Sequence, residues 1–203
     1  MHAVHEIADG VFWVGVNDRR LERFENMFPL SDGVAYNAYL IKDEKTALLD
    51  TVESSVRDRF LQVENVLDGR VLDYLVIHHM EPDHCGNIEE IVRRYPEVKV
   101  VGNRKTFEFF KHYYRTDLSA NAQVVKEGDL LSLGTRSLRF YLAPMVHWPE
   151  VMFSMDLSDG MLYSADAFGS FGALPGTLFA DELDFNRYFL GETRRYQIGR
   201  AHV

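Results

Sequence analysis

The stretch His78-His79-Met80-Glu81-Pro82-Asp83-His84-Cys85-Gly86-Asn87 decides the fold of this chain. It follows the apolar run Leu75-Val76-Ile77 and precedes apolar residues at helical spacing. The pattern therefore predicts a strand, a short loop and the start of a helix. The stretch contains four candidate metal ligands: His79, Glu81, Asp83 and His84. A loop at a strand end can hold such side chains on a fixed scaffold while they converge. The alternative, a polar turn that happens to be rich in His and acid, is disfavoured by more candidates downstream.

Two further candidate ligands also follow apolar strands. His147 comes after a strand expected to end at Ala143, and Asp166 after one expected to end at Ser164. Each alone is more often structural, as a packed His or a turn-forming Asp, but strand ends of one sheet can meet around one point. We expect His78 to support the site or to lie in the core. His2, His5 and His112 are expected at the surface.

Together the six candidates supply three imidazoles and three carboxylates, more than one tetrahedral ion needs. Two ions a few ångströms apart, bridged by one carboxylate, account for the whole set. Oxygen donors are as many as nitrogen donors, which favours iron or manganese more than a structural zinc site would. Zinc stays open as an alternative.

The 203 residues are enough for one large domain or two small ones, and their composition indicates a sizeable core. Hydrophobic residues make up 46%, and the net charge of −9 without a basic cluster argues against a nucleic-acid partner. We find neither a signal-peptide pattern at the N-terminus nor an apolar run long enough for a membrane. The single cysteine, Cys85, is expected to be a small buried residue rather than a thiolate ligand. A single cysteine fits a cytoplasmic protein.

The remaining pattern predicts strands, then helices, then strands, then a helix. We expect an exposed loop with a helical turn over residues 17–33. Strands are expected within 4–16 (two), and over 36–41, 46–52, 98–101, 124–125, 130–133, 138–143, 151–155 and 161–164. Helices are expected over 55–67, from the ligand-rich loop to Tyr95, over 105–114 and over 181–196. This order predicts an α+β protein in which two sheets pack between helices, an αββα sandwich.

At these residues the chain resembles the metallo-β-lactamase superfamily and, within it, the flavodiiron proteins, also called A-type flavoproteins. Hydrolases of the superfamily carry His-x-His-x-Asp-His, whereas Glu81 stands here at the second His, the mark of the iron-binding redox members. The spacings from His84 to His147 and from there to Asp166 also match. So do the strings YNAYLI, LLDTV, HWPE and SADAFG, and the resemblance runs from about residue 4 to 196.

The resemblance implies a ligand set and a reaction. His79, Glu81 and His147 would bind one iron, Asp83 and His84 the other, and Asp166 would bridge the two. The implied activity is reduction of O2 to water, or of NO to N2O, with electrons from FMN. A rubredoxin-like donor and a head-to-tail homodimer are implied as partners. Two alternatives remain: a dinuclear zinc metallohydrolase, which Glu81 disfavours, and an inactive metal-binding fragment.

Two family features have no counterpart in this sequence: a further His on the second iron, and a flavodoxin-like FMN domain. We therefore expect a truncated metallo-β-lactamase-like diiron domain over residues 1–196, incomplete at its C-terminal end. Residues 197–203 are expected to be a non-native tail. Gly199 breaks the helical pattern, and Ile198 to Val203 is what a common sequencing-adapter sequence encodes.

Overall fold

The computed structural model describes residues 4–24, 26–169, 171–173 and 178–182. The chain divides into two compact units. The first comprises Met1–Val16 and Asn37–Ala165, and the second comprises Asn17–Tyr36 and Asp166–Val203. Most of the described helices and strands belong to the first unit.

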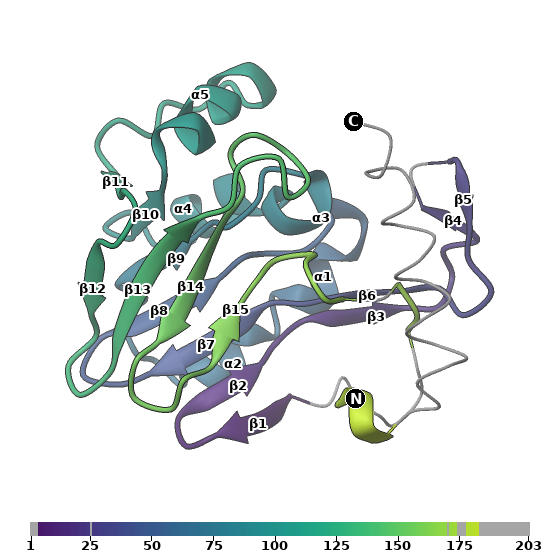
Figure 1. Cartoon of the computed structure of the whole chain (residues 1–203), viewed down its shortest axis with the longest axis horizontal. Helices are drawn as coiled ribbons and strands as arrows, with labels where there is room; N and C mark the ends of the chain where they lie inside the picture. Colours follow the sequence, from purple (N-terminus) through teal and green to yellow (C-terminus); the bar gives the residue numbers. More distant parts are fainter. Residues whose placement is uncertain (1–3, 25, 170, 174–177, 183–203) are drawn as a thin grey trace. The chain divides into compact units, whose positions relative to one another are not determined.

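The larger sheet of the first unit has seven strands and changes from antiparallel to parallel halfway across (Figure 1). Its spatial order is β1 (His5–Ala8), β2 (Val11–Trp13), β7 (Tyr39–Lys42), β8 (Thr46–Leu49), β9 (Tyr74–Val76), β10 (Lys99–Gly102) and β11 (Ala122–Val124). The pairs up to β7·β8 are antiparallel, and β8, β9, β10 and β11 pair in parallel. Parallel neighbours need crossover connections, which here contain the helices.

Each crossover carries short helical segments. They are η1 (Ser54–Val56), α1 (Arg57–Phe60) and α2 (Val63–Leu67) before β9, α3 (Pro82–Cys85) and α4 (Ile88–Arg94) before β10, and α5 (Arg104–Tyr113) before β11. Figure 1 shows α1, α2 and α4 behind the seven-stranded sheet. All four residues of β8 are buried, so both faces of this strand are covered.

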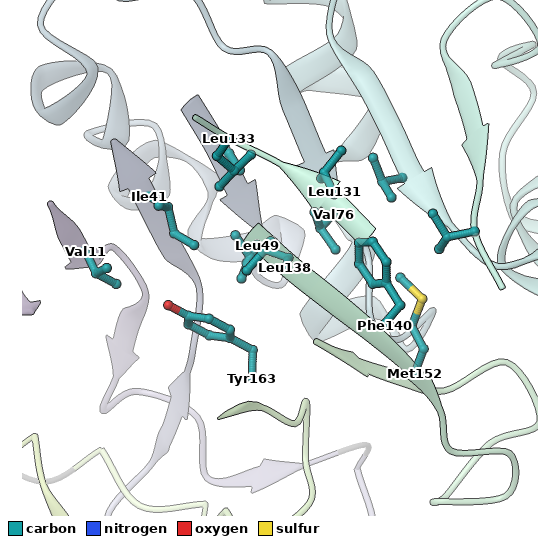
Figure 2. Packing of buried hydrophobic residues seen from close by; sticks show 13 residues of the cluster. Val11, Ile41, Leu49, Val76, Leu131, Leu133, Leu138, Phe140, Met152 and Tyr163 are labelled. Carbon is teal, nitrogen blue, oxygen red and sulfur yellow. The ribbon is translucent and has the colours of Figure 1, made fainter. Parts of the chain in front are cut away.

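The second sheet has four antiparallel strands: β12 (Leu130–Ser132), β13 (Ser137–Leu142), β14 (Met152–Asp156) and β15 (Leu162–Tyr163). It packs on the larger sheet through one apolar cluster. Figure 2 shows Leu138 and Phe140 of β13 beside Leu49 and Val76 of the larger sheet. The two packed sheets, with helices in the crossovers of the larger one, confirm the predicted α+β sandwich for the described residues.

The carboxyl ends of three parallel strands lie at the same edge of the larger sheet. Asp50 follows β8, His78 follows β9, and Asn103 follows β10. The second sheet joins this edge, because the backbone N–H of Met152 at the start of β14 donates to the His78 carbonyl at 3.0 Å. Crevices beyond the carboxyl ends of parallel strands are common ligand sites.

Most of residues 19–32 are exposed, as predicted, but the helical turn predicted within 17–33 is wrong, because short strands form there instead. The segments found there are β3 (Val16–Asp18), paired with β6 (Val34–Tyr36), and the hairpin β4 (Arg23–Phe24) with β5 (Phe28–Pro29). Asn26, with φ of 59°, lies in the turn of this hairpin. The ring of Phe24 lies 5.1 Å from that of Phe171, which fixes the strand by packing.

One helix prediction needs correction, and another lies almost wholly outside the described residues. The helix expected over 55–67 is interrupted between α1 and α2, and the segment η1 that precedes α1 has Glu53 as its N-terminal cap. The Glu53 carboxylate accepts the backbone N–H of Ser55 at 2.9 Å. Of the helix expected over 181–196, only η2 (Ala180–Glu182) reaches the described residues. The predicted domain limit at 196 and the predicted tail over 197–203 lie outside them.

Among the described residues, no helix combines the length and apolar character that crossing a membrane requires.

Candidate metal centre

The loop after β9 places the first four candidate ligands. The chain leaves the strand at Val76, and Glu81 takes an extended conformation as N-cap of α3, with φ of −69° and ψ of 144°. Pro82 occupies the first position of the helix, where its fixed φ fits and its missing N–H costs no hydrogen bond. His79 and Glu81 therefore lie before the helix, and Asp83 and His84 lie on its single turn.

Three of the predicted ligands point their donor atoms at one spot. Nε2 of His79 lies 3.0 Å from Oε2 of Glu81 and 3.1 Å from Nε2 of His147. Nε2 of His147 lies 2.8 Å from the same Glu81 oxygen. His79 and Glu81 come from the β9–α3 loop, whereas His147 comes from the loop between β13 and β14. Two imidazole nitrogens and a carboxylate oxygen at such distances form a set that attracts a cation.

Glu150 determines which nitrogen of His79 carries the proton. Its Nδ1 lies 2.6 Å from Oε1 of Glu150, and a carboxylate only accepts, so Nδ1 carries the proton. Nε2 then presents its lone pair to Glu81 and His147, as metal-bound histidines do. Burial would raise the pKa of Glu150, but its bonds to His79 and to the Met80 N–H lower that pKa below its ordinary value.

A second pair of candidates lies on α3. Nε2 of His84 lies 3.8 Å from Oδ2 of Asp83, and Nδ1 of His84 lies 3.5 Å from Oδ2 of Asp50. Burial opposes ionisation of Asp50, yet His78 and His84 hold the pKa of its carboxyl well below the usual range. Asp50 thus stands behind His84 as a carboxylate, much as Glu150 stands behind His79.

His78 has the supporting position expected of it. It is buried, its backbone N–H and Nδ1 lie 2.7 and 3.0 Å from the Asp50 carboxylate, and its Nε2 lies 2.8 Å from Oγ of Ser154 on β14. His78 therefore links the end of β9 to the second sheet. His5 and His112 are exposed, as predicted, and His2 lies outside the described residues.

Cys85 is a buried free thiol, as predicted. Its Sγ donates to the Met80 carbonyl at 3.2 Å, and its own carbonyl accepts the Tyr114 hydroxyl at 2.8 Å. Burial raises the pKa of this thiol to about 12, which disfavours the thiolate form. The donor set therefore stays one of nitrogen and oxygen atoms.

Aromatic rings cover His79 and His147. The His79 ring lies 4.9 Å from that of His147 and 5.1 Å, edge to face, from that of Trp148. Phe109 of α5 continues this layer, 6.3 Å from Trp148. Such a layer limits the access of water to the donor atoms.

Asp166, the sixth predicted ligand, lies three residues after β15 ends and is the first residue of the second unit's C-terminal segment. Its bridging role stays a prediction.

Sequence reasoning missed Asp50 and Glu150. Each follows or precedes an apolar strand, β8 and β14 respectively, in the strings LLDTV and HWPE that carry the resemblance. The only signal in the sequence was that each acid stands close to one end of an apolar strand.

One family and several known proteins are similar to this chain. Residues 34–191 match the family described as ODP family beta lactamase. The chain is 38% identical over 180 residues to the nitric oxide reductase of Moorella thermoacetica, an alignment that covers 88% of this chain and 45% of that protein.

Two solved structures extend the similarity to three dimensions. The flavodiiron protein from Giardia intestinalis superposes with a TM-score of 0.88 at 28% identity, over 97% of this chain and 47% of that one. The rubredoxin oxygen:oxidoreductase from Desulfovibrio gigas gives a TM-score of 0.86 at 34% identity, over 96% and 48%. The chain thus spans about half the length of these relatives.

Proposed function

Since this chain belongs to the ODP β-lactamase family, the metallo-β-lactamase-like domain of flavodiiron proteins, we propose that it is the diiron domain of an oxidoreductase. The substrate is O2, NO or both. The observation that carries the proposal is Glu81, a carboxylate whose Oε2 lies within 3.0 Å of both His79 and His147, where the hydrolases have a His. The relatives named above are reductases and oxidoreductases, which supports this reading over a zinc metallohydrolase.

The proposed ligand assignment follows the two groups of side chains. His79, Glu81 and His147 would hold one iron, Asp83 and His84 would hold the other, and Asp166 would be their shared ligand. The donor set fits iron because it mixes imidazole nitrogen with carboxylate oxygen and contains no thiolate. When bound, two ferrous ions would supply two electrons to the diatomic substrate, and FMN of the intact protein would supply the further electrons that reduction of O2 to water needs.

The side chains of this chain hold and shield that site. Glu150 keeps the proton of His79 on Nδ1, so Nε2 stays available as a donor. Glu81 is buried, and the rigid Pro82 that follows it restricts the backbone conformation of Glu81. Trp148 and Phe109 restrict the approach of water, which strengthens the attraction between the carboxylates and a cation.

In this proposal FMN, the electron donor and a second subunit act with the intact protein. Names among the relatives refer to flavin and to rubredoxin, and we extend both to this protein as FMN and a rubredoxin-like electron donor. A head-to-tail homodimer would bring the FMN of one chain near the irons of the other, because electron transfer needs close approach. The one cysteine, a free thiol, supports a cytoplasmic location.

The test uses metal-free chain titrated with ferrous iron under nitrogen. We expect two irons per chain by metal analysis, and consumption of O2 or NO at an electrode when the loaded chain is mixed with either gas. Glu81→Ala is expected to lose bound iron, whereas His112→Ala, which removes an exposed His outside the site, keeps both irons. A chain that binds one zinc, cleaves esters and consumes neither gas would contradict the proposal.

A further inference from the structure

Glu150 is a buried carboxylate with an incomplete set of hydrogen bonds. Its side chain is 0% exposed. Oε1 accepts from Nδ1 of His79 at 2.6 Å and from the backbone N–H of Met80 at 2.9 Å. Oε2 has no hydrogen-bond partner among the described residues. A carboxylate is costly to bury in this way unless a positive charge lies close by.

The positive charge that Glu150 needs lies in the direction of His79. The imidazole ring of His79 lies between the Glu150 carboxylate at Nδ1 and the converging donors at Nε2. The negative charge of Glu150 therefore balances, across the imidazole ring, the positive charge of a cation bound at Nε2. The carboxylate also makes Nε2 a stronger donor to that cation.

Glu150 is held in place by the fold and not by the site alone. Nδ2 of Asn103 donates to the Glu150 carbonyl at 2.5 Å. Oδ1 of the same Asn103 accepts the N–H groups of Lys105 and Thr106 and so caps α5. One residue thus fixes both the start of α5 and the backbone of Glu150, which pre-organises the carboxylate.

Asp50 lies on the Nδ1 side of His84, at a longer distance than the one that separates Glu150 from His79. Its Oδ2 lies 3.5 Å from Nδ1 of His84. Its two oxygens also lie 2.7 and 3.0 Å from the backbone N and Nδ1 of His78, which anchors the carboxylate. The two buried carboxylates therefore support histidines of different groups.

We propose that Glu150 is a positioning residue for His79 and that Asp50 is one for His84, so that each buried carboxylate sets the metal affinity of one position. This inference rests on the proposed function for the assignment of the two positions. Neither residue touches the metal, and each acts through the imidazole in front of it. Loss of an outer carboxylate of this kind weakens metal binding by roughly 10–100-fold.

The test measures cobalt(II) affinity by competition with a chelator, because Co(II) stands in for Fe(II) without oxidising in air. His84→Ala removes a ligand of the second metal, so that only the metal-binding position that contains His79 stays intact. In that background Glu150→Gln, which keeps size and the accepting oxygen but removes the charge, is expected to weaken the remaining site by roughly 10–100-fold. Asp50→Asn in the same background leaves it unchanged. Glu108→Gln, an exposed carboxylate on α5, is the matched control and changes nothing.

In the chain without His84→Ala, Asp50→Asn is expected to weaken one of two binding events and Glu150→Gln the other. Glu150→Gln that leaves both events unchanged, or weakens both equally, would overturn the inference while the proposed function stands. Failure of the unsubstituted chain to bind two ions would overturn the proposed function and this inference together.

A measurement on the unsubstituted chain covers the case in which a variant does not fold. In Co(II)-loaded protein, the Nδ1–H of His79 should give a shifted proton resonance in NMR that exchanges slowly with D2O, because Glu150 is buried. A rapidly exchanging or missing resonance would count against the inference.

Discussion

At the scale of single residues, Glu81 carries the chemical identity of the site. It supplies an oxygen donor between two imidazole nitrogens, 3.0 and 2.8 Å away. Oxygen donors suit harder and more oxidised metal ions, and imidazole suits zinc as well as iron. The residue type at position 81 should therefore affect the preference for iron over zinc more strongly than a substitution away from the donor atoms.

Glu81→His is expected to move the metal preference toward zinc. A third imidazole replaces the hard oxygen donor, so the ratio of bound zinc to bound iron should rise by about tenfold or more, equal to about 1.4 kcal/mol. The measurement is metal analysis after anaerobic incubation with equal amounts of the two ions. An unchanged ratio would show that Glu81 does not set the preference.

Ser154 supports the site from the second sheet. Because Nδ1 of His78 donates to Asp50, its Nε2 accepts the Ser154 hydroxyl at 2.8 Å. Ser154→Ala leaves that buried nitrogen without a donor and should lower the free energy of unfolding by about 1–3 kcal/mol. Urea denaturation measures the change, with Ser132→Ala on an exposed position of β12 as control. Equal stability of the two variants would argue against the bond.

Some residues of the site could be predicted from the sequence and others could not, and the difference has a physical reason. His79, Glu81, Asp83 and His84 lie in one motif, so local spacing is enough to predict them. Glu150 contacts His79 across 71 positions and Asp50 contacts His78 across 28, so only the fold brings them together. An acid at a strand end has no local feature that separates a turn-former from a carboxylate behind a ligand.

At the scale of elements, the break between α3 and α4 shapes the site. Gly86 ends α3 with φ of −59°, a conformation that any residue can adopt. Glycine is needed there because a side chain would not fit. A Cβ there would lie 2.7 Å from the Pro82 carbonyl oxygen and 2.8 Å from that of Val52. This close approach holds the single turn that carries Asp83 and His84 against the end of β8.

Gly86→Ala should therefore push that turn away from its support. We expect a loss of about 1–3 kcal/mol of unfolding free energy from overpacking. Weaker binding at the position of His84 than at that of His79 should accompany it. Thermal unfolding and cobalt titration measure the two effects. A variant as stable as the parent, with both sites intact, would show that the contact relaxes without cost.

The elements that the sequence predicts well are those set by local pattern. The hairpin around Asp9 and Gly10 and the antiparallel strands of the second sheet follow from alternation and turn residues. The helical turn within 17–33 was predicted wrongly because the strands that form there are only two or three residues long. Strands so short depend on partners distant in the sequence, such as Phe171 for Phe24.

At the scale of the whole molecule, the two sheets of the first unit are joined by a hydrogen bond from Arg136 as well as by apolar packing. Arg136, just before β13, donates to Asp156 of β14 at 2.6 Å and to Asp159 at 2.9 Å. Its other nitrogen donates to the Asp9 carbonyl in the β1–β2 turn at 2.7 Å. Asp156 is fully buried, so this guanidinium balances a charge inside the sandwich.

Arg136→Met should destabilise the fold far from the metal positions. Removing one partner of a buried ion pair costs about 3–5 kcal/mol, because the other charge stays buried. Urea denaturation of the metal-free chain measures it, and Arg139→Met on an exposed position of β13 is the matched control. A loss no larger than that of the control would mean that Asp156 is reached by solvent.

The aromatic cover over His79 has an optical consequence. The chain contains two tryptophans, and only Trp148 has its indole against a candidate ligand, 5.1 Å from the His79 ring. Trp13 is engaged elsewhere, with its indole N–H on Asn37. Ferrous iron entering the centre should quench the emission of Trp148, and Trp148→Phe should abolish that response. The protein's own ultraviolet fluorescence can thus report metal loading in real time, without a dye or a label.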